Sequence, residues 1–329
     1  MVQPTEPDLT PTPRSRWRTA GLRLLLVVAS TAAGLAVVAP LLRAQLAGHT
    51  TRLPADDLQK SDVPGIPWLW KANLRDFTNN QGLQMPYDIT TAKPPGTFRI
   101  LVLGDSVTSN AFGPGRHGVR TLYPAQLEHQ LAALTHKPVQ VLELAVPGLS
   151  LAQEMTLLQA RGLAFDPDVV LFGYCYNDPI ETDILQFPNL DTAHLTAALA
   201  AQAIENYRRQ SVVDWYAEPD GEVMRKLRDS FAQLGAWSKQ RHIAVVGLPV
   251  LTSDRAKQPH LAVIEPLAAA SGVAYVDLFD ALTPADLAQW RGSPNDDLHL
   301  NEAGHAAIAH VLARKLLPAV QAGAWPPPR

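Results

Sequence analysis

Between residues 98 and 317, short apolar runs alternate with longer amphipathic stretches. The short runs are apolar nearly throughout and span 99–103, 139–145, 169–172, 243–248 and 273–278. Runs of this length with little polar alternation are typical of strands buried on both faces of a parallel sheet. The pattern therefore predicts a five-stranded parallel sheet.

The stretches between these runs carry apolar residues at helical spacing, as parallel crossovers require. Helices are predicted over 123–134, 151–163, 195–207, 260–270 and 302–317. Asn301 is the expected N-cap of the last helix. A further helix precedes the fourth strand, and we interpret its apolar stripe as core packing: Met224, Leu227, Phe231, Leu234 and Trp237. Together, the predicted strands and helices indicate a three-layer α/β/α sandwich.

A longer apolar run lies near the N-terminus, where the nineteen residues 24–42 carry no charge. A helix of this length spans roughly the 30 Å hydrocarbon core of a bilayer. The polar, proline-rich residues before it disfavour a buried core helix. The run is also longer than a signal-peptide core and has no Ala-x-Ala site before Thr50. We therefore expect one uncleaved transmembrane anchor.

Arginines on the two sides of this run predict its orientation. The four that precede it are Arg14, Arg16, Arg18 and Arg23, whereas only Arg43 and Arg52 follow closely. By the positive-inside rule the N-terminus is cytoplasmic, and everything after the anchor lies outside the cytoplasm. We therefore expect a single-pass membrane protein whose main domain lies outside the cytoplasm.

The organisation predicted from these patterns has five parts: a cytoplasmic tail (1–23), the anchor (24–42), a juxtamembrane stalk or extended segment that packs onto the domain (43–97), the main domain (98–320) and a tail (321–329). Within the main domain, residues 178–240 form a long insertion between the third and fourth strands. This insertion is either an ordinary pair of helices with a polar loop or a wall over the ligand site.

Charge and cysteine content exclude several classes of protein. The 28 Lys and Arg residues against 31 Asp and Glu give a net charge of −3, which disfavours binding to nucleic acid. The single cysteine, Cys175, excludes an intramolecular disulfide and a multi-thiolate metal site, and we expect it to be buried and structural. His305 and His310 are expected on the surface of the last helix. We expect neither a metal nor a cofactor, since no glycine-rich phosphate loop follows the first strand.

Polar residues follow the predicted strands at the sheet edge where open α/β folds bind ligands. Ser106 comes directly after the first strand, Gly148 after the second and Asn177 after the third. Asp296 and His299 lie three residues apart after the fifth strand, where the aspartate could orient the histidine as a base for the serine. Asp297 is an alternative orienting residue.

These residues resemble, in order, the four sequence blocks of the SGNH or GDSL hydrolases. The resemblance runs from about Phe98 to Leu317 and is clearest in FRILVLGDSVT and DDLHLNEAGHAAIAHVLA. It implies a flavodoxin-like fold with Ser106 as nucleophile, His299 as general base and Asp296 as its orienting partner. The implied oxyanion donors are the backbone of Ser106, the backbone of Gly148 and the side chain of Asn177. Cys175 stands where the third block usually has glycine.

The resemblance and the predicted anchor together suggest a serine-dependent esterase that acts outside the cytoplasm through an acyl-enzyme. Its expected substrate is a small ester or an acylated envelope glycan. One alternative is an O-acyltransferase with the same triad, which would need a membrane partner to supply the acyl group. The other alternative is a non-catalytic glycan-binding module.

Overall fold

The computed structural model describes residues 30, 34, 57–109, 118–179, 216–252, 254, 258–279, 281–282, 287–292 and 296–323. The chain divides into two units, Met1–Thr51 and Arg52–Arg329. The predicted anchor, apart from helical residues 30 and 34, and the predicted helix 195–207 lie outside the described residues. Among the described helices, none is both long and apolar enough to cross a membrane. The anchor therefore stays a prediction.

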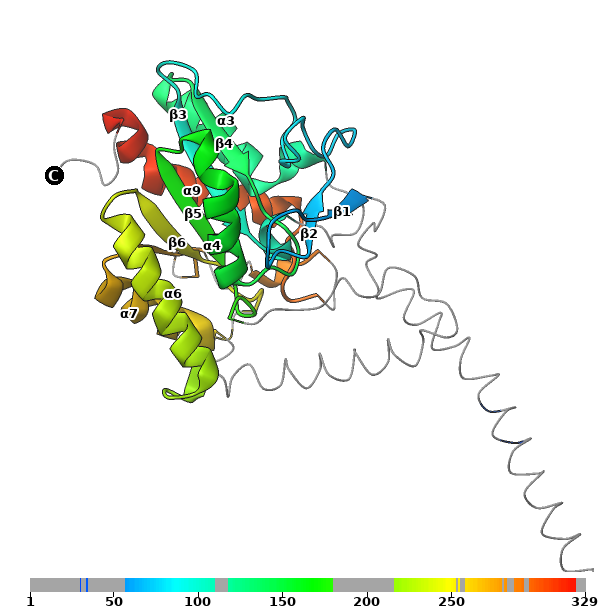
Figure 1. Ribbon diagram of the computed structural model, residues 1–329, viewed down its shortest axis with the longest axis vertical. Coiled ribbons are helices and arrows are strands. Elements are labelled where there is room, and N and C mark those ends of the chain that lie inside the picture. The colour runs from blue at the N-terminus through cyan, green and yellow to red at the C-terminus, as the bar shows by residue number, and fades with distance from the viewer. Residues whose placement is uncertain are drawn as a thin grey trace, which may run out of the picture. The chain divides into compact units, whose positions relative to one another are not determined.

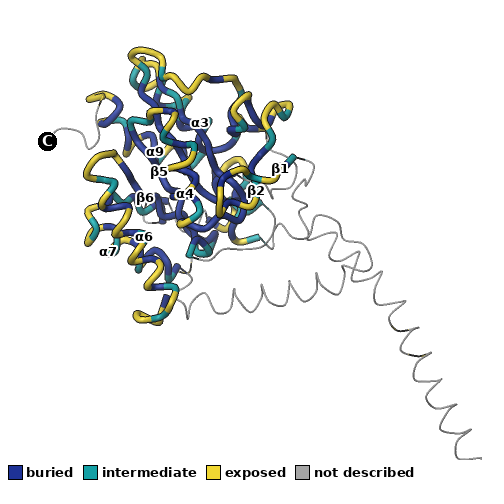
Figure 2. The backbone as a smooth tube through the Cα atoms, viewed as in Figure 1, coloured by how far each residue is buried: buried dark blue, intermediate teal, exposed yellow. Residues whose placement is uncertain are grey.

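The prediction of a five-stranded parallel sheet is confirmed (Figure 1). Its strands are β3 (Phe98–Gly104), β4 (Val139–Glu143), β5 (Val169–Tyr174), β6 (Ile243–Gly247) and β7 (Ala274–Asp277). They pair in the order β4-β3-β5-β6-β7, and every pair is parallel. Every residue of β3, β5 and β6 is buried, because helices cover both faces of the sheet (Figure 2).

The helices form two layers, one on each face of this sheet. On one face α3 (Tyr123–Thr135) packs against α9 (Glu302–Ala322), and the other face carries α4 (Leu151–Ala160), α6 (Glu222–Ser238) and α7 (Pro259–Ser271) (Figure 1). Right-handed crossovers explain this division, because the step from β3 to β4 runs opposite to the later steps along the sheet. The reversal creates a switch point beside β3, where open sheets bind ligands.

Local sequence explains where the helices begin and what they bury. The side chain of Asn301 accepts a hydrogen bond from Gly304 N (3.0 Å), as its predicted role as N-cap of α9 requires. Ser150 and Gln153 form a capping box at the start of α4. The predicted apolar stripe of α6 lies in the core or packs against it, as expected.

The prediction that His305 lies on the surface of the last helix is wrong, whereas His310 is exposed as predicted. His305 is fully buried in α9, where its Nδ1 accepts a hydrogen bond from Tyr123 N (3.2 Å) and its ring stacks on that of Tyr123. Because α9 packs on α3, a position one turn into the helix faces the layer partner instead of water.

Residues 57–97 pack on the main domain and contain an antiparallel pair that the sequence did not reveal. Strand β1 (Leu58–Lys60) pairs with β2 (Trp68–Trp70). The ring of Trp70 meets that of Phe77 edge-on at 4.8 Å, and both are buried. Trp70 also donates through Nε1 to the carbonyl of Ala145 (3.0 Å), just beyond the end of β4. This contact ties the N-terminal segment to the turn that contains Gly148.

Candidate active site

Ser106 is separated from the end of β3 by one residue, Asp105, and is the first residue of the short helix α2 (Ser106–Ser109). The turn before it is held by Asp105, whose Oδ1 accepts a hydrogen bond from Val107 N (2.8 Å) and whose carbonyl accepts one from Ser109 N (3.0 Å). The side chain of an aspartate that bonds a backbone two residues ahead fixes such turns. The position of the serine hydroxyl is therefore set by its immediate neighbours.

Two glycines on adjacent strands give this helix its room. Gly104 of β3 and Gly173 of β5 are register partners. A Cβ at Gly104 would lie 2.7 Å from Thr108 Cβ, and one at Gly173 would lie 2.6 Å from Thr108 Oγ1. Thr108 fills this space and its Oγ1 lies 3.0 Å from the hydroxyl of Tyr123. The glycines thus let α2 lie against the carboxyl ends of both strands.

A chain of hydrogen bonds joins the predicted triad. His299 Nε2 lies 2.9 Å from Ser106 Oγ, and His299 Nδ1 lies 2.8 Å from Asp296 Oδ2. The other oxygen of Asp296 accepts from the backbone N–H groups of His299 and Leu298, each at 3.0 Å. Of the two aspartates that the sequence offered, Asp296 contacts the histidine, whereas Asp297 is exposed.

Electrostatics keep Asp296 ionised beside this histidine. Burial by itself raises the pKa of Asp296, but the side chain of His299 and the two backbone N–H groups outweigh it and lower the pKa to about 2. An ionised carboxylate accepts from Nδ1–H and so favours the tautomer that leaves Nε2 free to take the proton of Ser106. The local charge therefore matches general-base chemistry.

Backbone bonds from three directions hold the loop that carries His299. Asp297 O accepts from Leu251 N (2.6 Å) in the loop after β6, and His299 O accepts from Gly292 N (2.8 Å). Asn301 N donates to Trp290 O (2.7 Å) immediately before α9 begins. A loop fixed at this many points positions a base more firmly than a free loop would.

Gly148 lies in the turn between β4 and α4. Its φ of 77° is in the left-handed region, which favours glycine over residues with a Cβ. The turn starts close to Ser106, because Val146 N donates to Gly104 O (3.0 Å) at the end of β3. The structure thus places the Gly148 turn next to the β3 end from which Ser106 projects.

Asn177 lies beyond the end of β5, and its side chain is bound to the residue before the nucleophile. Its Nδ2 donates to Asp105 Oδ2 (3.1 Å), and its Oδ1 lies 2.8 Å from Cys175 Sγ. The amide of Asn177 is therefore held on both sides. Cys175 is buried, as expected.

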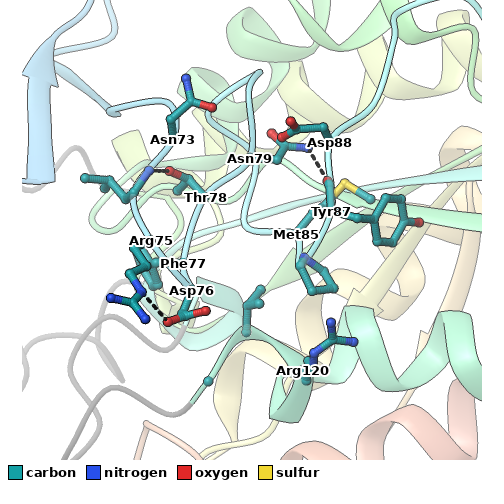
Figure 3. A pocket seen from close by; sticks show the side chains of 14 residues that line it. Asn73, Arg75, Asp76, Phe77, Thr78, Asn79, Met85, Tyr87, Asp88 and Arg120 are labelled. Atoms are coloured by element: carbon teal, nitrogen blue, oxygen red, sulfur yellow. Dashed lines mark hydrogen bonds and ion pairs between the residues drawn. The ribbon is translucent and has the colours of Figure 1, made fainter.

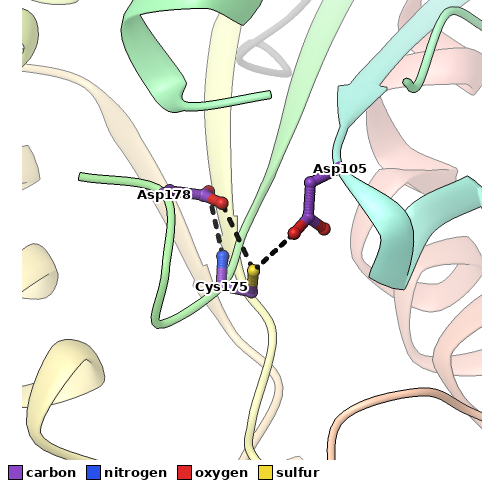
Figure 4. A group of neighbouring side chains, drawn as sticks. All are labelled: Asp105, Cys175 and Asp178. Carbon is purple, nitrogen blue, oxygen red and sulfur yellow. Dashed lines mark hydrogen bonds between the residues drawn. The ribbon is translucent and has the colours of Figure 1, made fainter. Parts of the chain in front are cut away.

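A group of buried acids surrounds this cysteine (Figure 4). Cys175 donates through its backbone N–H to Asp178 Oδ2 (3.0 Å), and its Sγ lies 3.2 Å from an oxygen of Asp178 and of Asp105. Burial raises the pKa of Asp178, and Asp105 raises it further. Burial, followed by Asp178 and Asp105, does the same to Glu154 of α4. The ionised forms of Asp178 and Glu154 are thus both disfavoured in this group.

The residues of this site lie within a segment that matches a known protein family. A model of the GDSL-like Lipase/Acylhydrolase family matches residues 102–307, which contain Ser106, Gly148, Asn177, Asp296 and His299. The chain belongs to this family. Its members act on ester bonds, so this GDSL-like acylhydrolase is an ester-hydrolysing enzyme. Among curated proteins, none matches the chain.

Several solved structures are similar to this GDSL-like acylhydrolase. A lipase/acylhydrolase from Enterococcus faecalis has 16% identity and a TM-score of 0.44, with 67% of this chain and 95% of that one covered. The acetylxylan esterase Axe2 from Geobacillus stearothermophilus has 16% identity and a TM-score of 0.44, with coverage of 67% and 94%. An α/β hydrolase, LAE5, from the metagenome of Lake Arreo, Spain, has 17% identity and a TM-score of 0.43, with coverage of 67% and 96%.

Sequence reasoning missed several residues that support the site of this GDSL-like acylhydrolase. Thr108 and Tyr123 brace the nucleophile helix, and Gln84 donates through Nε2 to the carbonyl of Ser109 at its end (3.1 Å). For Thr108 and Tyr123, the only hint in the sequence was the pair of glycines at 104 and 173. Gln84 had none, because residues 57–97 show no periodicity.

A cavity of about 460 Å³ with both polar and apolar walls lies beside the same N-terminal segment (Figure 3). Its walls come from residues 73–79, 85–88 and 118–120. Asn73 and Asp76 in its wall have φ of 61° and 59°, a conformation that asparagine and aspartate tolerate better than most residues. Met85 in its wall is the neighbour of Gln84, so the cavity adjoins the support of α2.

Proposed function

We propose that this GDSL-like acylhydrolase is a serine esterase that removes an acyl group from an envelope glycan through an acyl-enzyme intermediate. The observation that carries the proposal is the continuous chain of hydrogen bonds from Asp296 through His299 to Ser106. A serine hydroxyl is a weak nucleophile until a neighbouring base takes its proton, and this arrangement supplies that base.

The first half of the reaction forms the acyl-enzyme. Ser106 Oγ attacks the ester carbonyl while its proton passes to His299 Nε2, and the carbonyl oxygen becomes an oxyanion. Backbone N–H groups of Ser106 and Gly148 and Nδ2–H of Asn177 are the proposed donors to that oxyanion. The carbon–oxygen ester bond then breaks, and His299 returns the proton to the leaving alkoxide.

The second half releases the acyl group. Water attacks the carbonyl of the acyl-enzyme and gives its proton to His299 Nε2. The bond to Ser106 Oγ breaks, the proton returns to that oxygen, and the carboxylic acid leaves. Asp296 stabilises the positive charge that His299 carries in each half.

The place of action and the glycan substrate rest on the predicted anchor at 24–42 and the arginines before it. A domain held outside the cytoplasm meets envelope polymers as its nearest source of bound esters. An alkaline phosphatase fused to the C-terminus, which is active only after export, tests this orientation. Phosphatase activity in whole cells is expected, and its absence would remove the extracytoplasmic part of the proposal.

The decisive experiment incubates the full-length protein in detergent micelles with 4-nitrophenyl acetate, with and without an oligosaccharide acceptor. Release of acetate to water at a rate that the acceptor does not change is the expected result. Ser106→Ala should lower kcat by about 10³-fold or more. Ser109→Ala, in the same helix, is the matched control and should retain most of the activity.

Other outcomes point to the other functions considered for this chain. Acetyl transfer to the oligosaccharide in place of hydrolysis would support an O-acyltransferase. Binding of the oligosaccharide with neither release nor transfer would support a non-catalytic module. Full hydrolysis by Ser106→Ala would remove the proposed mechanism.

A further inference from the structure

Cys175 occupies an unusual place, because its thiol contacts the side chain proposed to bind the oxyanion. Its Sγ lies 2.8 Å from Asn177 Oδ1, closer than to the oxygens of Asp105 and Asp178 at 3.2 Å. Within the described part of the chain, Asn177 Oδ1 has no other partner at hydrogen-bond distance. The thiol is fully buried at the end of β5 and does not face solvent.

Chemistry determines which group donates in this contact. Burial raises the pKa of the Cys175 thiol well above its usual value, and Asp105 and Asp178 raise it further. The sulfur therefore keeps its single proton, and the nearest of its three oxygen neighbours is Asn177 Oδ1, an amide oxygen that can only accept. On its other side Asn177 donates through Nδ2 to Asp105 Oδ2 at 3.1 Å.

A side-chain amide has two orientations that exchange its oxygen and its NH₂ group. Turning the Asn177 amide over would set its NH₂ against the thiol and its oxygen against the Asp105 carboxyl. The first change replaces the S–H to oxygen contact by a contact between NH₂ and the thiol. The second places two oxygens against each other. Both contacts are poorer than the donor–acceptor pairs that they replace. The thiol and the carboxyl therefore select the same orientation from opposite sides, and one N–H of Nδ2 remains for another acceptor.

We propose that Cys175 is a positioning residue: its S–H bond to Asn177 Oδ1 fixes the amide so that Nδ2–H is presented to the oxyanion. This inference rests on the proposed function, since it needs Asn177 as an oxyanion donor. Cys175 itself touches no reacting atom. It acts in the transition state through Asn177, so it affects kcat more than KM.

The test compares variants of the full-length protein in detergent micelles with 4-nitrophenyl acetate as substrate. Cys175→Ala and Cys175→Val remove the donor, and valine also keeps the space filled. Cys175→Ser keeps a donor. Asn177→Ala and the double variant Cys175→Ala/Asn177→Ala complete a cycle that measures coupling between the two residues.

We expect Asn177→Ala to lower kcat by about 10² to 10³-fold. Cys175→Ala and Cys175→Val should lower kcat by about tenfold with KM unchanged, and Cys175→Ser should recover most of that loss. The double variant should match Asn177→Ala, because the cysteine has no effect once the amide is gone. Thermal unfolding verifies that each variant is folded, and the valine and serine variants decide the matter if alanine unfolds the protein.

Two results would overturn the inference in distinguishable ways. Wild-type kcat in Cys175→Ala and Cys175→Val, combined with a slow Asn177→Ala, removes the role of Cys175 and leaves the proposed function intact. Wild-type kcat in Asn177→Ala removes the oxyanion role of Asn177 and the inference together.

Discussion

Asp296 and His299 lie three positions apart in one loop, and their contacts account for the charge state of the pair. The aspartate accepts from the imidazole and from two backbone N–H groups, and its pKa falls to about 2 although burial opposes this. Because that pKa is below the usual value for aspartate, the carboxylate stabilises the fold at pH above about 4, and the contribution is lost as the pH falls toward 2.

Asp296→Asn removes the charge and leaves the shape. We expect kcat to fall by about 10³ to 10⁴-fold with little change in KM, because the wrong tautomer of His299 is favoured. Steady-state hydrolysis of 4-nitrophenyl acetate measures this. Asp297→Asn is the control, since that side chain is exposed. Equal kinetics for the two variants would contradict the assignment of Asp296.

The contribution of Glu143, the last residue of β4, to stability depends on pH in the opposite direction. It is 1% exposed, its carboxylate oxygens have no hydrogen-bond partner in the described part of the chain, and burial raises its pKa well above the usual value. The folded state therefore holds a proton that the unfolded chain releases above about pH 4.3. Its stabilising effect is complete below that pH and is lost as the pH rises, by up to about 1.4 kcal/mol per pH unit.

Glu143→Gln mimics the protonated side chain at every pH. Relative to the wild type, its free energy of unfolding should therefore rise between about pH 5 and about pH 8. Urea unfolding at several pH values measures the difference. Glu265→Gln, at an exposed position in α7, should show no such trend. A pH-independent difference for Glu143→Gln would mean that the buried carboxyl does not titrate in this range.

At the scale of elements, the site depends on how closely α2 approaches the ends of β3 and β5. The two register partners Gly104 and Gly173 leave the space that Thr108 fills. The helix can therefore turn sharply after β3 and present Ser106 toward His299. A side chain on either strand at this level would push the nucleophile away from its base.

Gly173→Ala tests this packing directly, since the new Cβ would meet Thr108 Oγ1 at 2.6 Å. We expect a loss of about 1–3 kcal/mol in stability and a fall in kcat of about tenfold or more. Adding Thr108→Ala removes the clashing oxygen and should restore part of the kcat. Gly118→Ala, with nothing within 4 Å of the new Cβ, is the control. Failure of the second substitution to restore any activity would refute the steric explanation.

For the whole molecule, the segment 57–97 matters because it contacts both turns of the site. Trp70 donates to Ala145 ahead of the Gly148 turn, and Gln84 donates to Ser109 at the end of the nucleophile helix. This segment precedes the residues that match the family, which begin at 102. Residues outside the part that matches the family therefore contact both turns of the site.

Two truncations separate the contributions of the N-terminal parts. Removal of residues 1–51, the first of the two units, should leave esterase activity on 4-nitrophenyl acetate unchanged and release the protein from membranes. Removal of residues 1–97 should abolish activity and stability, because it uncovers apolar surface and leaves the carbonyls of Ala145 and Ser109 without their donors. Activity measurements and thermal unfolding decide both, and an active, stable second truncation would contradict the role of the segment.

Sequence pattern by itself determined the parallel sheet and the described helices of its layers, and the resemblance to the GDSL blocks indicated Ser106, Asp296 and His299 as the triad. These features depend on local pattern: β-branched runs, helical spacing, an N-cap at Asn301 and a DxxH spacing that puts Asp296 and His299 in one loop. The preference for Asp296 over Asp297 came from the DxxH spacing of the family block, and in the structure Asp296 is the aspartate that contacts His299.

Tertiary structure alone decided what depends on residues distant in the chain. His305 is buried because α3 covers it, and residues 57–97 join the domain by burying apolar side chains in its core and by contacts such as the Trp70 bond to Ala145. Asp105 follows β3 and Cys175 follows β5, so no local pattern could show that the two residues lie in contact beside Asn177. Burial and donor geometry arise only when strands become neighbours, and for that reason these features were beyond the reach of periodicity and spacing.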